Sequence, residues 1–403
     1  MDLTDPIVVL AEGYEGLCAA AWLASLGRAV RVLHDGPISS GPWDPVIAGE
    51  EGRLDPVLGP TRPTGDRPTL LWERRIVAVP RRRREVAALC GTGLVGLAGE
   101  LWGADRRLPR DLGGWGGQRF GRSGWDTVVG PLLAASLGGD PGVLHRGVGP
   151  LLTCRPDGPW RAPVRGAQAT ISTWIEAIRH AGGDVLEDVH VTAVEIEDAR
   201  VAAVMADHGR EHAATLVSDL AAPRVAALLP TDPDADADPS GLDCADQVHV
   251  AWVAPNDLPP LVVAAGDAAR VRRAIEDDGA SSPDRGWVTL VGPGLAKLDD
   301  AALVARVRSA LPATMASGGP AAILRAARSV PRPTPATEGL VFRWLRRLAA
   351  LGIAPVGPRA LHVPMLTRDV VDTTVAVLDG VPPIAVRGGR LGLTPSRPWM
   401  LVQ

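Results

Sequence analysis

Lysine is nearly missing from this chain, and its scarcity narrows the possible chemistry. Lys297 is the only lysine among the 42 lysine and arginine residues. Aromatic residues other than tryptophan are also scarce, with two Phe and one Tyr beside twelve Trp. A mechanism that needs an active-site lysine therefore has one candidate, and its Leu-Asp-Asp context is typical of an exposed helix start.

Cysteine and long apolar runs are also limited. The four cysteines form no CxxC pair, which argues against a zinc site and a disulfide framework and fits a reducing compartment. No signal-peptide pattern is present, and no apolar run approaches the ~20 residues that span a bilayer. We therefore expect a cytoplasmic protein without a transmembrane segment. The net charge of −4 gives no support for a nucleic-acid partner.

The first forty residues are the most informative part of the chain, because they predict a nucleotide-binding βαβ unit. An apolar strand at 6–10 runs into a glycine-containing loop at 11–16, and a helix follows to about Gly27. A second strand at 29–33 ends at His34 and Asp35. This is the order of a dinucleotide-binding fold, in which loop glycines let the backbone approach a pyrophosphate.

The loop of this unit departs from the usual glycine pattern. Ala11 takes the place of the first glycine, while Gly13 and Gly16 keep the other two. Glu12 and Glu15 add carboxylates where a pyrophosphate would lie. Each would repel the ligand by about 1 kcal/mol or more unless its side chain points to solvent. The pattern predicts the fold, together with a loop that binds a dinucleotide poorly.

Hydrophobic periodicity predicts the remaining elements. At 403 residues the chain has room for about two domains. The Gly- and Arg-rich segment 108–124 is expected to be a loop, and Asp207–Arg210 to be a hairpin turn between strands at 201–206 and 215–218. Residues 231–240 have the composition of a polar linker. Helices are predicted at 81–90, 125–137, 169–181, 301–311 and 339–351, with further strands at 69–72, 76–79, 184–186, 189–196, 248–253, 261–264, 287–291 and 384–386.

Several segments resemble the flavin-dependent group that contains protoporphyrinogen oxidase, monoamine oxidase and phytoene desaturase. Residues 8–33 resemble its N-terminal βαβ unit, and GRLDPVLGP at 52–60 resembles its Gly-x-x-Leu-Asp-x-Gly-Pro stretch. PLLAASLGGDPGVL at 131–144 is similar to a protoporphyrinogen-oxidase pattern, and residues 165–220 resemble the second cofactor-domain block. The match spans most of residues 6–230, whereas the C-terminal half matches in layout only.

The resemblance implies an α/β architecture with a Rossmann-like (FAD/NAD(P)-binding) domain and a second, strand-rich α+β substrate-type domain. The first would comprise 1–60, 160–245 and 380–403, and the second 61–159 and 246–379. It implies FAD as the cofactor and small apolar molecules or protein partners, with a homo- or hetero-oligomer as an option. The cofactor-binding positions carried over are Ala11, Gly13, Gly16, His34, Asp35, Gly41, Val191 (through its backbone) and Gly389.

Departures from the family pattern fall on cofactor contacts. The acid that binds the adenosine ribose falls on His34, and Asp35 is one place late, which would turn it to the other side of the strand. The Gly-Gly-Arg segment is reduced to Ser40-Gly41-Pro42. The family's long final helix faces the flavin with its N-terminal amides, whereas here Gly389 precedes a short tail with two prolines.

Other motifs carry less information. His208 and His212 flank a predicted hairpin turn rather than one face of a helix, which argues against a metal pair. Asp232, Asp234 and Asp236 echo a calcium loop without its glycine and glutamate, so a linker is the better interpretation. The run at 81–84 fits a solvated helix start better than an anion site. Trp115, Phe120 and Trp125 fit either a pocket lining or core packing. No Ser–His–Asp, HExxH or Walker pattern is present, so no catalytic residue is assigned.

Two classes of function remain open. In one, the protein is an active FAD-dependent oxidoreductase that oxidises an apolar or polycyclic substrate by hydride transfer to the flavin. In the other, it is a relative with lost or weakened FAD binding that serves as a non-catalytic binding or scaffold protein. The concentration of departures on cofactor contacts favours the second class. Amine oxidation is the least favoured chemistry, because Lys297 is the only lysine and Tyr14 the only tyrosine.

Overall fold

Contacts divide the chain of the computed structural model into two compact units, which are described separately. Unit 1 comprises residues 1–63, 156–242 and 336–403, and unit 2 comprises 64–155 and 243–335. The structure describes residues 7–36, 38, 47–48, 61–63, 69–72, 75–78, 83–91, 109–148, 160–163, 166–231, 238–254, 261–263, 269–275, 281–362, 384–386 and 391–393.

Unit 1 is built on a parallel sheet of five strands in the order β18-β12-β1-β2-β8. These are β1 (Ile7–Ala11), β2 (Val30–His34), β8 (Asp184–Leu186), β12 (Thr215–Ser218) and β18 (Ile353–Pro355). Every residue of β1 is buried, as expected for a central strand covered on both faces. The predicted βαβ unit is present, with helix α1 (Tyr14–Ser25) joining β1 to β2.

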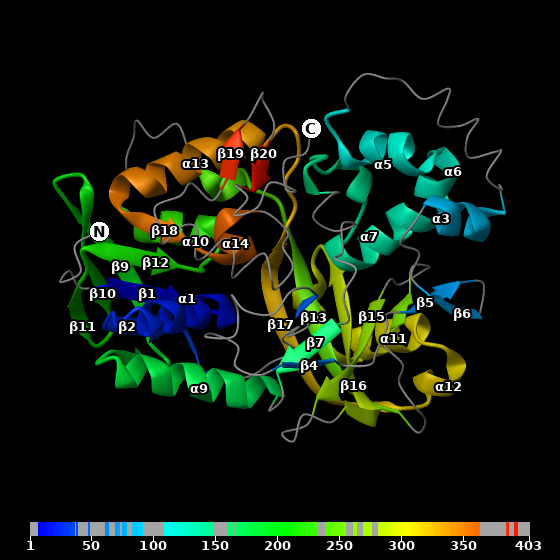
Figure 1. Ribbon diagram of the computed structural model, residues 1–403, viewed down its shortest axis with the longest axis horizontal. Coiled ribbons are helices and arrows are strands. Elements are labelled where there is room, and N and C mark those ends of the chain that lie inside the picture. Colours follow the sequence, from blue (N-terminus) through cyan, green and yellow to red (C-terminus); the bar gives the residue numbers. More distant parts are fainter. Residues whose placement is uncertain are drawn as a thin grey trace. The chain divides into compact units, whose positions relative to one another are not determined.

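Helices α1 and α9 (Gly166–His180) lie side by side against this sheet (Figure 1). Ile171, Trp174 and Ile178 of α9 are spaced three and four residues apart, so they share one face of the helix. That face packs with Leu17 of α1 and with Val32 of β2. The i, i+3, i+4 pattern of α9 is therefore satisfied by burial on α1 and the sheet.

Unit 1 also contains a three-stranded antiparallel sheet, which follows α9 and β8 in the sequence. It contains β9 (Val191–Glu197), β10 (Arg200–Ala206) and β11 (Gly209–His212). The turn at 207–210 therefore joins β10 to β11, and the predicted pairing with strand 215–218 is wrong. That segment is β12, which pairs in parallel with β1. A turn pattern fixes a reversal of the chain but not which later strand completes the hairpin.

Further elements of unit 1 flank these sheets. Helix α13 (Glu338–Leu351) contacts β18 and β10, and α10 (Ala222–Leu228) contacts β9. The sequence-based division places residues 246–379 in the second domain, whereas contacts group residues 336–403 with unit 1. The pairing of β18 with β12 accounts for this grouping. The remaining elements are α14 (Gly357–Leu361), η3 (Pro239–Gly241), β3 (Ile47–Ala48), β4 (Thr61–Pro63), β7 (Trp160–Pro163), β19 (Ile384–Val386) and β20 (Leu391–Leu393).

Unit 2 contains a seven-stranded sheet in the order β17-β13-β16-β15-β14-β5-β6. The strands are β17 (Gly319–Pro331), β13 (Cys244–Val253), β16 (Ser281–Gly292), β15 (Ala269–Ile275), β14 (Leu261–Val263), β5 (Thr69–Trp72) and β6 (Arg75–Ala78). Strands β15 and β17 have no counterpart among the elements predicted from the sequence. Alternate residues Val248, Val250 and Trp252 of β13 form one buried face.

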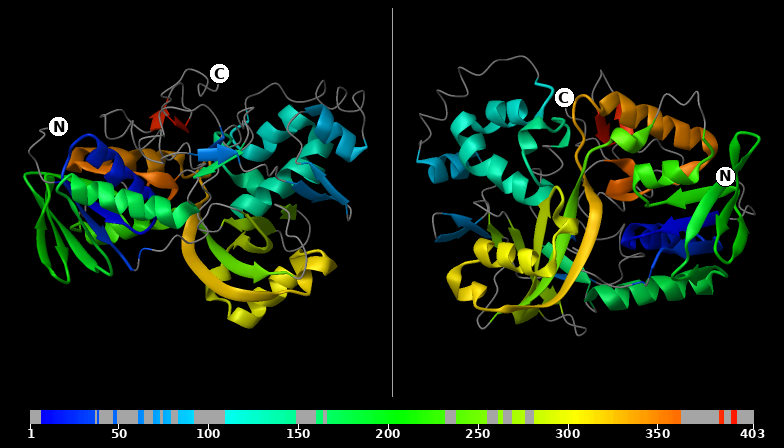
Figure 2. Two further views of the ribbon diagram at one scale, coloured as in Figure 1. Left: turned by 60° about the horizontal axis from the view of Figure 1, so that its bottom comes forward. Right: turned by 180° about the vertical axis from the view of Figure 1, so that it is seen from behind.

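Helical segments lie on both sides of this sheet (Figure 2). One side holds η4 (Leu295–Lys297), α11 (Asp300–Ala310) and α12 (Ala313–Ala316), and Trp252 Nε1 donates to the Met315 carbonyl at 3.0 Å. On the other side, helix α7 (Gly130–Leu137) contacts β14, β15 and β16. Five further helical segments contact α7 or its neighbour η1: they are α3 (Arg83–Cys90), α5 (Leu112–Phe120), α6 (Arg122–Gly124), η1 itself (Trp125–Val129) and η2 (Pro141–Val143).

Helix α5 corrects the prediction of a loop at 108–124. Asp111 caps its N-terminus by accepting a hydrogen bond from the amide of Gly114 at 2.7 Å. A Cβ at Gly116 would overlap the ring of Trp125, so this glycine allows the helix to approach η1 closely. Tertiary packing therefore outweighs the low helix propensity of the glycines.

Arg332 follows β17 and ties it to the C-terminal end of α7. Its guanidinium donates to the carbonyls of Leu137, Gly138 and Asp140 and pairs with Asp243 at 3.0 Å. Arg332 is buried, and a buried charge without partners would be costly. These acceptors compensate the charge of its guanidinium. Within the described part of the chain, no helix has the length and apolar character needed to cross a membrane.

Candidate functional site

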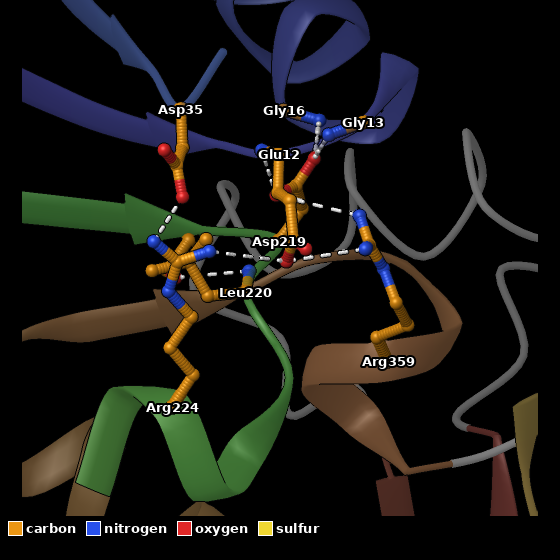
Figure 3. Close-up of polar contacts among 9 residues, drawn as sticks. Glu12, Gly13, Gly16, Asp35, Asp219, Leu220, Arg224 and Arg359 are labelled. Atoms are coloured by element: carbon orange, nitrogen blue, oxygen red, sulfur yellow. Dashed lines mark hydrogen bonds and ion pairs between the residues drawn. The ribbon is translucent and has the colours of Figure 1, made fainter. Parts of the chain in front are cut away.

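Polar side chains of unit 1 meet where four parallel strands end. Glu12 and Gly13 follow β1, Asp35 follows β2, Asp219 follows β12, and α14, which carries Arg359, follows β18 (Figure 3). The carboxyl ends of parallel strands share one edge of a sheet, so segments far apart in sequence meet there. In open α/β sheets this edge is the usual place for a ligand.

Asp219 is the centre of the cluster. Its Oδ1 accepts a hydrogen bond from the amide of Glu12 at 2.7 Å, and its Oδ2 accepts from the amides of Gly13 at 3.0 Å and Gly16 at 2.9 Å. Its residue exposure is only 1%. Amides at the start of a helix that follows a glycine loop form an anion site, and here the anion is a carboxylate of the same chain.

The loop glycines allow this close approach. A Cβ at Gly13 would lie 2.5 Å from Oε2 of Glu15 and 2.8 Å from Nη2 of Arg359. A Cβ at Gly16 would lie 2.7 Å from the Cβ of Ala11 and 3.0 Å from Oδ2 of Asp219. Gly16 therefore requires glycine while the carboxylate is in place, because Ala11 presents its Cβ and backbone there, whereas the two atoms nearest to Gly13 are the ends of flexible side chains.

Two arginines neutralise the surrounding carboxylates. Arg359 lies 3.1 Å from Oε2 of Glu12 and 4.0 Å from Oδ1 of Asp219. Arg224 of α10 lies 3.7 Å from Oε2 of Glu12 and forms an ion pair with Asp35. Arg359 is the more buried of the two, with a side-chain exposure of 13% against 32%. Buried pairs of this kind fix geometry more than they add stability.

Burial and neighbouring charges shift three pKa values in the cluster. Desolvation raises the pKa of Glu15 to about 7 against the lowering effect of Arg359, and Asp219 adds to the rise. Burial also raises the pKa of Asp219, although Arg359 and the amides of Glu12 and Gly16 oppose it. Burial lowers the pKa of Arg359, but the carboxylates led by Asp219 outweigh it and the net direction is upward. Glu15 therefore titrates near neutral pH.

The structure places Glu12 and Glu15 differently from either expectation. Glu12 does not point freely to solvent, because it pairs with both arginines. Glu15 is buried, and its Cβ and Cγ lie close to Gly357 at the start of α14. Neither carboxylate occupies the loop amides, which are taken by Asp219.

The remaining predicted cofactor positions are dispersed along the strand ends. Ala11 ends β1 and packs against Gly16. His34 ends β2, is buried, and has its Nδ1 2.9 Å from the carbonyl oxygen of Gly36. Val191 begins β9 and is buried. Gly41 and Gly389 lie outside the described residues.

Other sequence candidates have structural roles where the structure describes them. Nε2 of His208 lies 3.1 Å from Glu211, and His212 contacts Arg210. Lys297 ends η4 and is exposed. The described residues contain no group of three or more His, Cys, Asp or Glu side chains arranged to hold a metal ion. Arg83 and Arg84, at the start of α3, are exposed, and residues 81–82 and 232–236 lie outside the described ranges.

The aromatic residues of the predicted loop belong to a helical core. Trp115 and Phe120 form an edge-to-face pair with ring centroids 6.0 Å apart, and Arg119 stacks over both rings. Phe120 and Trp125 are buried with Val128 and Leu133. Core packing is therefore the role that the contacts support.

Sequence reasoning missed Asp219, Arg224 and Arg359. Asp219 carried a usable signal, since it directly follows an apolar strand and precedes a helix. Recognising that strand as a parallel neighbour of β1 would have placed Asp219 beside the loop. The two arginines gave no such signal in an arginine-rich sequence, because their partners Glu12 and Asp35 lie far away along the chain.

No family model matches the sequence, and no curated protein matches it. Solved structures do. Reduced UDP-galactopyranose mutase is 15% identical with a TM-score of 0.70, covering 94% of this chain and 95% of that one. An oxidoreductase from Methanosarcina mazei is 15% identical with a TM-score of 0.69, covering 93% and 100%. The CLA-producing fatty acid isomerase from P. acnes is 11% identical with a TM-score of 0.67, covering 94% and 99%.

The chain has the fold that these solved structures share. The α/β class with a parallel sheet and a strand-rich second part is thereby confirmed. These solved structures are of a mutase, an isomerase and an oxidoreductase, so the shared fold does not select a reaction.

The resemblance of the sequence to the flavin-dependent group implies FAD, and the residues present can be tested against that cofactor. A pyrophosphate would need the amides of Glu12, Gly13 and Gly16, all of which donate to Asp219. Asp35 is engaged by Arg224, and His34 is turned to the Gly36 carbonyl. In this arrangement the residues do not fit the pyrophosphate of FAD.

Proposed function

We propose that this protein is a homologue of the FAD-dependent amine oxidase superfamily with lost or weakened FAD binding, acting as a non-catalytic binding or scaffold protein. The observation that carries the proposal is the Asp219 carboxylate on the three loop amides. These amides are the donors that a dinucleotide-binding fold offers to phosphate. Here they have an acceptor within the chain.

Electrostatics supports weak binding even if Asp219 can move. A pyrophosphate on the loop would regain the amide hydrogen bonds that Asp219 loses, so those bonds nearly cancel. What does not cancel is repulsion between the ligand and the displaced carboxylate, which is tethered at the same strand end. At about 4 Å this costs about 1 kcal/mol in water and about 4 kcal/mol at the permittivity typical of a protein surface. Affinity would fall by about fivefold to a thousandfold.

The occupant or partner of such a protein would be a small apolar molecule or another protein, including a second copy of this chain. The retained layers of unit 2 support a role that depends on an intact fold. They include a sheet face packed on α11 and α12, and a separate helical core around Val128 and Leu144.

A second candidate is an active FAD-dependent oxidoreductase acting on an apolar or polycyclic substrate. The geometry of Gly13 and Gly16 favours it, since both positions keep the close backbone approach that a phosphate loop requires. Under this alternative, Asp219 would have to leave the amides before the cofactor bound.

One direct measurement distinguishes the two candidates. The absorbance spectrum of the purified protein is recorded first as isolated, and again after incubation with excess FAD followed by gel filtration. We expect no flavin bands to stay with the protein. Flavin bands that persist through gel filtration, and that appear in the supernatant after denaturation, would establish the second candidate. Bands that appear only in the included volume would support the proposal, because they would show free FAD.

A further inference from the structure

We infer that Asp219 is an internal anion that closes the loop to phosphate-bearing ligands, and that removing this one carboxylate opens the loop amides to a phosphate anion. The inference rests on the proposed function and names the residue responsible for it.

The contact with the three loop amides is made by Asp219 and not by the neighbouring glutamates. Glu12 contributes its backbone amide to the site, while its side chain is held away by Arg359 at 3.1 Å and Arg224 at 3.7 Å. Glu15 lies against Gly357. Removing either glutamate side chain therefore leaves the three amides occupied, whereas removing the Asp219 carboxylate frees all of them.

The charges of the cluster support the same inference. Six ionisable side chains make up the cluster: the carboxyl groups of Glu12, Glu15, Asp35 and Asp219, and the guanidiniums of Arg224 and Arg359. Arg359 pairs with both Glu12 and Asp219, so loss of Asp219 removes one of its carboxylate partners. A phosphate on the amides would then meet a partly uncompensated arginine, which favours an anion there.

Two substitutions separate charge from space. Asp219→Ala removes both the carboxylate and the atoms that fill the site. Asp219→Asn removes the charge but leaves a side chain of the same shape, whose amide oxygen can still accept from the loop. If the site is closed mainly by occupancy, the alanine variant binds an anion more tightly than the asparagine variant. Both should bind it more tightly than the wild type.

Asp246 provides a matched control in unit 2. It is 7% exposed, and its carboxylate accepts hydrogen bonds from the amides of Ala296 at 3.1 Å and Arg328 at 2.9 Å. Asp246→Ala therefore also removes a buried carboxylate from backbone donors, but its donors belong to η4 and β17 and not to the loop between β1 and α1. A general effect of losing a buried aspartate would appear in both alanine variants.

The experiment is titration calorimetry with inorganic pyrophosphate and with ADP at low ionic strength, alongside thermal unfolding with and without pyrophosphate. We expect the dissociation constant for pyrophosphate to fall at least tenfold from wild type to Asp219→Ala, with an intermediate value for Asp219→Asn. Pyrophosphate should raise the melting temperature of Asp219→Ala and leave that of wild type and Asp246→Ala unchanged. Circular dichroism checks folding, and Asp219→Asn carries the test if the alanine variant fails to fold.

Equal pyrophosphate affinity in wild type and the Asp219 variants would overturn the inference, as would the same gain in Asp246→Ala. The FAD spectrum of the wild type separates this failure from that of the proposed function. A colourless wild type with unresponsive Asp219 variants overturns the inference alone. A wild type that retains FAD overturns the proposed function and the closed loop, whereas a gain in pyrophosphate affinity in the Asp219 variants would still show that this carboxylate opposes phosphate on the loop amides.

Discussion

Replacing Glu15 with glutamine should make the protein more stable in mildly alkaline solution. Glu15 is buried beneath the loop, and desolvation raises its pKa from 4.5 to about 7 despite the nearby Arg359. Glutamine has nearly the shape of the protonated side chain and no charge to lose. The substitution thus keeps the packing against Gly357 and removes the titration.

The sign and size follow from proton linkage. Between pH 4.5 and about 7 the folded protein keeps the Glu15 proton that the unfolded chain has lost. The free energy of unfolding then falls with rising pH by about 1.4 kcal/mol per pH unit. The stabilisation that this proton confers is fully present only below the unfolded pKa of 4.5 and is lost as pH rises through about 7. Over this interval the loss amounts to about 3 kcal/mol. Glu15→Gln should match wild type near pH 5 and exceed it by up to this amount at pH 8.

The assay is urea unfolding at pH 5, 6, 7 and 8, followed by tryptophan fluorescence, with the midpoint compared between variants at each pH. Glu176→Gln, on the exposed face of α9, is the control and should track wild type throughout. A constant difference between Glu15→Gln and wild type across this range would refute the reasoning. So would a lower stability of Glu15→Gln at pH 8, because Arg359 would then outweigh desolvation.

Three further substitutions test the packing described above. Gly16→Ala should lower the free energy of unfolding by about 1–3 kcal/mol, because its Cβ would meet the Cβ and the backbone of Ala11. Gly117→Ala in α5, where a Cβ meets nothing within 4 Å, should instead raise it by up to about 1 kcal/mol, and equal urea midpoints for the two would contradict this. Arg332→Met should cost about 2–4 kcal/mol by leaving buried carbonyls without a donor, and a thermal unfolding curve unchanged from wild type would disprove that role.

The sequence predicted elements well where local periodicity determines them. The βαβ unit, α9 and strand β8 lie within a few residues of their predicted ranges, because each has its own apolar pattern and glycine boundaries. Helix α5 was missed because its glycines lower helix propensity, and the reasons for glycine are tertiary contacts, such as those of Gly114 with Pro109 and of Gly116 with Trp125. Packing of this kind has no signature in a single sequence.

The candidate site shows how one error of topology hides chemistry. The strand at 215–218 was correctly predicted, but as the partner of the preceding hairpin. Its actual place beside β1 brings Asp219 to the glycine loop. The loop defect was therefore attributed to Glu12 and Glu15, whereas the carboxylate on the amides comes from a position about two hundred residues away. Local sequence reports which groups are available, but the order of strands decides which ones meet.

The internal carboxylate also explains how the loop fold persists without depending on a ligand. The first amides of a helix lack acceptors within the helix, and burying them unpaired is costly. In a dinucleotide-binding protein the phosphate can supply the acceptor, so the empty loop relies on water. Here Asp219 pairs the amides of Glu12, Gly13 and Gly16 permanently, and Arg359 offsets the charge. The loop amides of unit 1 thus have a hydrogen-bond acceptor before any ligand arrives. A phosphate that binds these amides must first displace a carboxylate, which is also an anion.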